Sequence, residues 1–312
     1  MSYESATPIA GSPTFTRGVK AKWERSPPTV WLGVPIHFAR YDPPSNTNQT
    51  LDVRGRTRTV ARWEDSEWSD FKRDFIRTIN EFWHHRFVLV PASRTSRGMP
   101  PDMPGALICG YKAWAEPNPE WATMKPLVFK PATEGGWQRS ECQFFGRPIS
   151  SGLPLNAPRG ITSVLDKSDL EPRTIHTPIH TSPVPVISEQ RGATHESGHH
   201  IGLMHRCIRV SVRDVPSFRS FNVDMYDGDN SSLEGTYVHE QARATSRGGN
   251  GYCVASNDKV AIQDLMARGE SCHPWHAAPW VHIIQSAANS PDADSFLQTV
   301  GRVTWTPIVR HG

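Results

Sequence analysis

The sequence predicts an α+β protein, in which short strands and one long helix precede a histidine-rich helix and a smaller C-terminal region. Three features favour this class: helical spacing of large apolar residues over 66–85, several short β-type runs bounded by proline, and the stretch ATHESGHHIGLMH at 193–205. The chain has 312 residues, of which 37% are hydrophobic, so it can bury one large core or two lobes.

The charge balance makes several classes of partner improbable. Lys and Arg number 34 against 31 Asp and Glu, a net charge of +3, which indicates neither a nucleic-acid nor a membrane-surface partner. A membrane span needs roughly eighteen consecutive apolar residues, and the sequence contains no such run.

The N-terminal segment, residues 1–28, is rich in Ser, Thr and Pro. We expect a flexible or loosely draped tail, or alternatively a pro-segment. It has no apolar h-region, so it does not predict a signal peptide. The chain is then already processed, exported by another route, or retained in the cell, and we favour export by another route.

The first regular elements follow this segment. In TVWLGVPIHFARY, apolar residues alternate from Leu32 to Phe38, which predicts a strand, and Pro35 predicts that it lies at an edge or a bulge. Residues 66–85 carry apolar side chains at helical spacing with charges between them, which predicts an amphipathic helix. Its apolar positions are Trp68, Phe71, Phe75, Ile79 and Phe82.

Further elements are expected along the rest of the chain. RFVLVPA, GALICGYKAWAE and MKPLVFKPA are strand candidates separated by proline-rich turns. PVPVISEQ is expected to enter the histidine-rich helix, with Ser188 as its N-cap. PWVHIIQSAA places Trp280, Ile283 and Ala287 on one face, which predicts a last helix.

The histidine-rich helix has the spacing of a metal site. His195 and His199 are four residues apart, so on a helix both side chains project from one face and can share an ion. Glu196 completes H-E-x-x-H, in which the carboxylate is too short to be a third ligand and faces the water that the metal activates. Gly202 and His205 extend the pattern, because a glycine lets the chain leave the helix and bring a third imidazole back.

HESGHHIGLMH is similar to the zinc-binding sequence of the metzincin metalloendopeptidases, with the pappalysin-like group the nearest subfamily. This resemblance implies one Zn²⁺ per chain, held by His195, His199 and His205, with Glu196 as general base and acid. It also implies a metzincin-like two-lobe catalytic domain: a mixed twisted sheet, an active-site helix and a smaller C-terminal lobe. The domain would span 29–312, with the N-terminal lobe at 29–205 and the C-terminal lobe at 206–312.

The family also has a methionine turn beneath the zinc, and the best match is Met266 in DLMARG. A short helix from an Asn257 cap to a Gly269 stop is the alternative, with Met266 in its apolar stripe, and Met225 is a weaker substitute for the turn. Some members carry a catalytic tyrosine two residues after this methionine. Arg268 stands there, so no tyrosine role is carried over.

Other candidate ligands have a weaker basis. Asp227 and Asp229 hint at calcium, but their loop lacks the glycine and terminal glutamate of an EF-hand, which favours a solvated turn. His200 is expected to face away from His199, as a supporting or surface residue. Packing or surface roles are favoured for the remaining C-terminal histidines, His239, His273, His276 and His282, and a structural role for Cys207. In an oxidised protein, Cys253 and Cys272 are the first pair expected.

Two functions remain open from sequence. The first is a zinc endopeptidase, a hydrolase that cleaves a protein or peptide substrate. The second is a zinc-stabilised binding or structural component of a larger assembly with little or no turnover. The full set of three histidines together with Glu196 favours the first.

Overall fold

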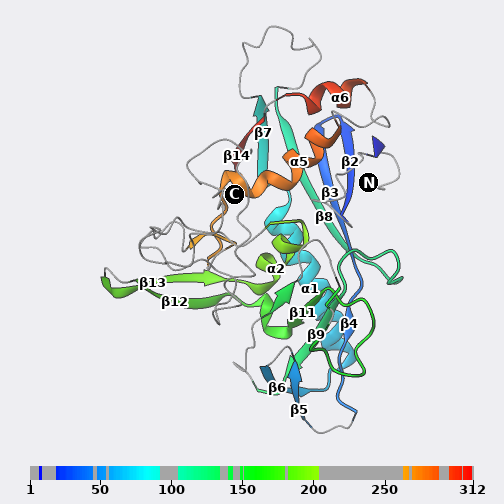
Figure 1. The fold of residues 1–312 in the computed structure, drawn as a ribbon, viewed down its shortest axis with the longest axis vertical. Helices are drawn as coiled ribbons and strands as arrows, with labels where there is room; N and C mark the ends of the chain where they lie inside the picture. The colour runs from blue at the N-terminus through cyan, green and yellow to red at the C-terminus, as the bar shows by residue number, and fades with distance from the viewer. Residues whose placement is uncertain are drawn as a thin grey trace, which may run out of the picture.

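In the computed structural model the chain passes from one mixed β-sheet to a second between β3 (Pro28–Ile36) and β4 (Ala39–Arg40) (Figure 1). The structure describes residues 7–8, 19–44, 48–53, 56–91, 105–133, 140–142, 148–149, 151–179, 182–203, 263–266, 269–287, 295–303 and 305–310. Their elements are of both kinds, with more strand than helix, which confirms the α+β class.

The first sheet has the order β1 (Thr7–Pro8), β2 (Lys20–Arg25), β3 (Pro28–Ile36), β8 (Leu107–Ala115), β7 (Phe87–Pro91), β14 (Trp305–Val309). The second has the order β10 (Glu141–Cys142), β11 (Ser163–Asp166), β9 (Pro126–Pro131), β6 (Arg56–Ala61), β5 (Gln49–Val53), with β4 (Ala39–Arg40) beside β9. β3 is parallel to β8, and β4 and β11 are parallel to β9, whereas β10 is antiparallel to β11.

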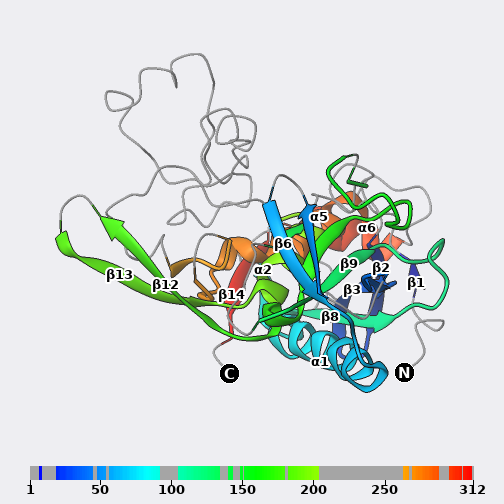
Figure 2. The same ribbon diagram turned by 90° about the horizontal axis from the view of Figure 1, so that it is seen from below.

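The helices lie against these sheets, and one hairpin projects from them (Figures 1 and 2). The hairpin pairs β12 (Arg173–Ile179) with β13 (Ser182–Gln190), and β13 leads directly to α2. The helical segments are α1 (Asp65–Trp83), η3 (Lys167–Leu170), α2 (Gly192–His200), η5 (Pro274–Ala277), α5 (Ala278–Ala287) and α6 (Ser295–Gly301). None of these described helices is both long and apolar enough to cross a membrane.

The locally patterned elements form where the sequence predicts them. α1 buries Phe71, Phe75, Ile79 and Trp83 along one face, as its helical spacing requires. Its N-terminus carries a capping box between Glu64 and Glu67, which satisfies backbone N–H groups that the helix cannot pair. The predicted strands after it are β7, β8 and β9, and the predicted last helix is α5.

Two expectations about the N-terminal part are wrong. Residues 20–25 of the segment expected to be flexible form β2, because Trp23 is 2% exposed in the core and the backbone pairs with β3. β3 itself is an internal strand of its sheet and not an edge. Its Pro35 is tolerated because β2 pairs with β3 no further than Gly33, so the proline lies beyond that partner.

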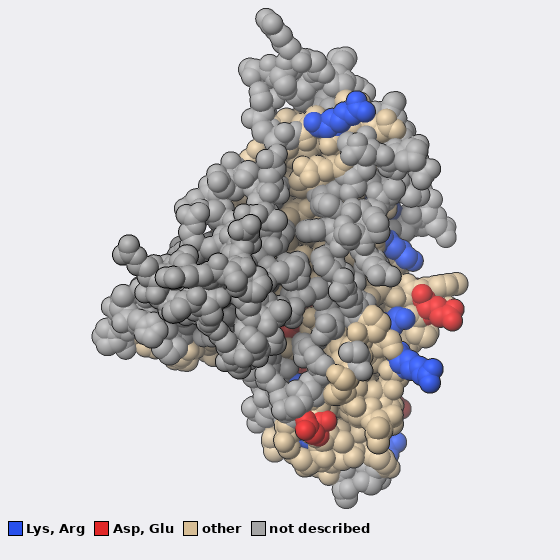
Figure 3. Space-filling view, in the orientation of Figure 1, with Lys and Arg blue, Asp and Glu red and all other residues tan. Residues whose placement is uncertain are grey.

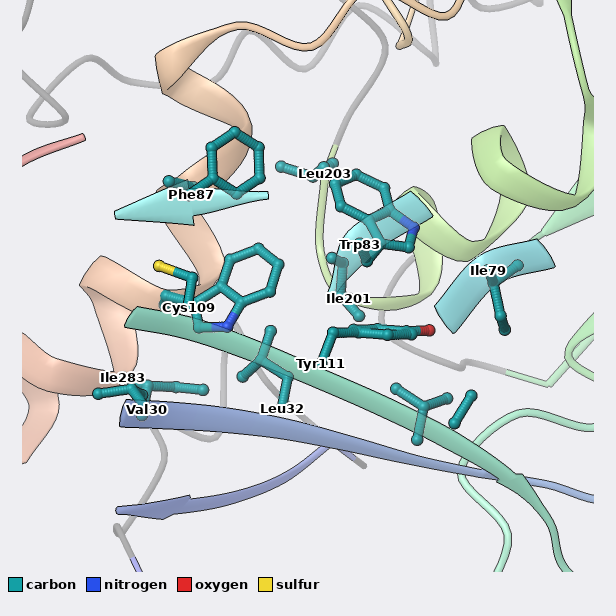
Figure 4. Close-up of a cluster of buried hydrophobic side chains, with 14 of the residues drawn as sticks. Val30, Leu32, Ile79, Trp83, Phe87, Cys109, Tyr111, Ile201, Leu203 and Ile283 are labelled. Carbon is teal, nitrogen blue, oxygen red and sulfur yellow. The ribbon is translucent and has the colours of Figure 1, made fainter. Parts of the chain in front are cut away.

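One hydrophobic core joins residues from both predicted lobes (Figure 4). Val30 and Leu32 of β3 lie in it with Trp83 of α1, and Ile283 of α5 reaches it from the C-terminal region. β14, which was not predicted, pairs antiparallel with β7 and so completes the first sheet from the C-terminal end. The described C-terminal residues therefore share the N-terminal core, and the lobe boundary at residue 205 stays a prediction.

Figure 3 shows charged side chains of both signs on the described surface. This distribution agrees with the near balance of acidic and basic residues in the sequence.

Candidate metal centre

α2 carries the histidine motif and is buried along nearly its whole length, since residues 193–200 are all buried. Most of these residues are polar, so packing of an apolar face does not explain the helix. It begins one residue after β13. Ser188 lies within β13 opposite Ile175, so the expected Ser188 N-cap is wrong, because strand pairing continues to Gln190.

The helix N-terminus is held instead by Glu270, from the C-terminal region. Its Oε1 accepts from the Arg191 backbone N–H at 2.8 Å, and its Oε2 pairs with the Arg191 guanidinium at 2.9 Å. A carboxylate at this end also interacts favourably with the helix dipole.

His195 and His199 point toward each other from successive turns. Their Nε2 atoms are 3.1 Å apart, and each residue is 3% exposed. The rings are nearly perpendicular, with centroids 4.7 Å apart. The i, i+4 spacing therefore places two imidazoles at one point inside the protein.

Backbone carbonyls determine which nitrogen of each ring carries the proton. His195 Nδ1 is 2.7 Å from the Leu265 carbonyl oxygen, and His199 Nδ1 is 2.8 Å from that of Leu203. A carbonyl can only accept, so both Nδ1 atoms donate and, in the neutral rings, both Nε2 atoms hold lone pairs. Gln190 Nε2 also lies 3.0 Å from His195 Nδ1, but it has the carbonyls of Leu265 and Gly269 to donate to.

The arrangement of the two Nε2 lone pairs fits a zinc ion. Two lone pairs facing each other at 3.1 Å repel one another unless a cation or a proton lies between them. Two nitrogens that bind one tetrahedral zinc at its usual bond length are about 3.3 Å apart, close to the observed separation. Metal-binding histidines commonly donate their other N–H to a carbonyl, which fixes the ring orientation.

Gly202 ends the helix as the sequence predicts. Its φ is 103°, a conformation that favours glycine. Its N–H bonds to the His199 carbonyl at 3.0 Å, and the Leu203 N–H bonds to the Gly198 carbonyl at 2.9 Å, which together form a Schellman motif. The same turn brings the Leu203 carbonyl to His199 Nδ1. Figure 4 shows Ile201 and Leu203 beside Trp83, so the core anchors the chain where it leaves α2.

Met266 lies in a turn and packs against α2. A Cβ placed on Gly198 would be 2.7 Å from its sulfur and 3.3 Å from Trp83, so a larger residue here would force Met266 to shift. Trp83 also donates through Nε1 to the Ser197 hydroxyl at 2.8 Å. Residues 257–262 of the alternative helix lie outside the described residues. Sequence analysis did not assign Gly198 a role, although a glycine inside a helix is itself a signal of close packing.

Glu196 and His200 are both buried. Glu196 is 6% exposed and adjoins His195 in the motif. His200 faces away from His199, as expected, but it is not on the surface, since its Nε2 is 3.2 Å from the Thr123 hydroxyl. Burial lowers the pKa of His200 to about 4, so the ring is neutral at physiological pH.

Several residues considered in the sequence analysis lie outside the described residues. These are His205, Met225, Asp227, Asp229, His239, Cys207 and Cys253. Within the described ranges, no three or more His, Cys, Asp or Glu side chains are grouped to hold a metal. His276 is 1% exposed and bonds to Asp264 at 3.2 Å, which agrees with a packing role. Cys272 has a free thiol in the described structure, and its expected partner Cys253 lies outside the described residues, so the pair in an oxidised protein stays a prediction.

No protein-family model matches the sequence, and comparisons with curated proteins and with solved structures find no significant similarity.

Proposed function

We propose that the protein is a zinc-dependent endopeptidase of the metzincin type, with His195, His199 and His205 as metal ligands and Glu196 as general base. The observation that carries this proposal is the pair of buried imidazoles, whose Nε2 atoms converge at 3.1 Å while carbonyls hold both Nδ1 protons. Ordinary packing does not require both rings to turn the same acceptor atom toward one point.

The chemistry of the site follows from these residue types. When bound, zinc supplies a Lewis acid that lowers the pKa of a water toward neutrality and polarises a carbonyl. Glu196 takes the proton from the attacking water and later delivers it to the leaving amine. The hydrogen bonds from their Nδ1 atoms to backbone carbonyls hold both rings with Nε2 toward the same point, where it can bind the ion.

The edge strand β10 lies against α2 and is the position at which we expect the substrate to bind. In the described part of its sheet it forms an edge, antiparallel to β11, and it packs against α2. We propose that a peptide substrate binds there in extended form, through main-chain hydrogen bonds along that edge.

The test compares Glu196→Gln with the parent on unfolded casein, with and without a chelator. General acid–base catalysis contributes about 10²- to 10⁴-fold, so cleavage should fall at least about a hundredfold at saturating substrate, while zinc stays bound. Glu189→Gln is the matched control, because Glu189 is exposed on β13 and should leave cleavage unchanged.

Two results would contradict the proposal. One is a Glu196→Gln protein that cleaves as fast as the parent. The other is a parent that cleaves nothing a chelator can protect, in which case a zinc-stabilised binding or structural component takes the place of the enzyme.

A further inference from the structure

The described residues 263–266 and 269–271 lie beside α2 and belong to one loop. Backbone hydrogen bonds join its two ends. The Ser271 N–H donates to the Gln263 carbonyl at 2.9 Å, and the Leu265 N–H donates to the Ser271 carbonyl at 3.0 Å. A third bond joins the Gly269 N–H to the Asp264 carbonyl at 3.0 Å. These bonds restrict the positions that the Leu265 carbonyl can take.

This loop contacts α2 at its functional positions. Leu265 supplies the carbonyl for His195 Nδ1, and the Met266 sulfur packs against Gly198. Glu270 holds the backbone and guanidinium of Arg191. A displacement of the loop would therefore change the orientation of the His195 ring, because the ring is hydrogen-bonded to the Leu265 carbonyl.

Asp264 joins the loop to η5. It is 0% exposed, and its Oδ1 accepts from the Met266 backbone N–H at 2.7 Å and lies 3.2 Å from His276 Nε2. His276 Nδ1 accepts from the His273 N–H at 3.0 Å, so the proton of the neutral ring is on Nε2 and is donated to Asp264. Because both ring nitrogens are engaged, His276 is not a metal ligand here.

We propose that Asp264 is a positioning residue for the metal site. Held by His276, it fixes the turn at Met266 and thereby the Leu265 carbonyl that orients His195. This inference rests on the proposed zinc site. Groups that orient metal ligands from outside the coordination shell affect metal affinity, typically by about 10- to 100-fold when they are removed.

The experiment measures Zn²⁺ affinity by competition with a chromophoric chelator. Asp264→Ala should bind zinc at least about tenfold more weakly than the parent. Asp264→Asn keeps an oxygen acceptor for the Met266 N–H and should recover most of the affinity. Asp42→Ala is the matched control, because Asp42 also accepts from a backbone N–H, that of Trp63 at 2.9 Å, in a part of the fold away from α2.

A second readout separates positioning from general loss of stability. The visible spectrum of the Co²⁺-substituted protein reports ligand geometry, and it should change in Asp264→Ala and stay unchanged in Asp42→Ala. Equal zinc affinity in Asp264→Ala and the parent overturns the inference. So does an equal loss in Asp264→Ala and Asp42→Ala.

If Asp264→Ala does not fold, His276 supplies the test. His276→Ala removes the donor to Asp264 and should weaken zinc binding, whereas His276→Gln can place an amide N–H near the position of Nε2 and should restore it. Equal affinities in these two variants overturn the inference. A parent that binds no zinc refutes the proposed function itself, and is recognised before any variant is compared.

Discussion

Asp169 lies against the first residue of α2, and its carboxyl group is fully buried. Its Oδ2 accepts from the Ser140 hydroxyl and from the Asp166 backbone N–H, and its Oδ1 is 2.0 Å from where a Cβ on Gly192 would stand. Burial, and next the negative charge of Asp166, raise the pKa of Asp169 to about 7, against the opposing effects of its hydrogen bonds and of Arg173.

The raised pKa makes the stability of the fold depend on pH in a definite direction. The folded protein binds this proton more tightly than the unfolded chain, whose carboxyl has a pKa near 3.8. The stabilising contribution is therefore fully present below about pH 4 and is lost as the pH rises to about 7. A difference of about three between the two pKa values corresponds to on the order of 4 kcal/mol in the free energy of unfolding.

Asp169→Asn removes this dependence, because the amide stays neutral. We expect urea unfolding of the zinc-free protein to show the variant gaining stability relative to the parent between pH 5 and pH 8, by a few kcal/mol in order of magnitude. Asp65→Asn is the control, because Arg40 holds the pKa of the exposed Asp65 carboxyl below its usual range, so this group titrates below pH 5 and its curve should run parallel to that of the parent between pH 5 and pH 8. Parallel curves for the parent and Asp169→Asn would refute the reasoning.

Three further changes test the helix and its surroundings. Gly202→Ala should lower the free energy of unfolding by about 1–2 kcal/mol, because φ is 103° there, as thermal melts would show. Trp83→Phe loses the bond to Ser197 and should cost about 1–2 kcal/mol in urea unfolding, whereas unchanged stability would contradict that bond. His199→Ala should fall well below one zinc per chain by elemental analysis, and full occupancy would reject the ligand assignment. Burial raises the pKa of the partly buried Cys272 to about 12, so iodoacetamide should label it slowly in the folded protein at pH 8, and fast labelling would contradict the raised pKa.

The features that sequence predicts well here are local ones. The apolar spacing of α1 and the i, i+4 spacing of His195 and His199 depend on helix geometry alone. Gly202 was also predictable, because leaving a helix within one turn requires a backbone conformation that other residues avoid.

The errors arise where a distant partner decides the outcome. Ser188 was expected to cap the helix, but pairing with β12 draws it into a strand. β2 was not predicted, although its Ala21 and Trp23 alternate with charged residues as in a strand. The Ser, Thr and Pro content of residues 1–28 favoured a flexible segment instead. Whether such a short run becomes a strand depends on the partner that β3 supplies.

By itself the sequence determined the metal-site hypothesis: which two imidazoles share a helix face, which carboxylate adjoins them, and which glycine ends the helix. Tertiary structure alone decided how that helix is held. Leu265 orients His195, Met266 occupies the space that Gly198 leaves open, and Asp264 links their loop to His276. The contacts of Leu265 and Met266 with α2 join residues about seventy positions apart, and the first uses a backbone carbonyl, which every residue carries. Asp264 and His276 are 12 positions apart, a separation that matches no helix or strand period.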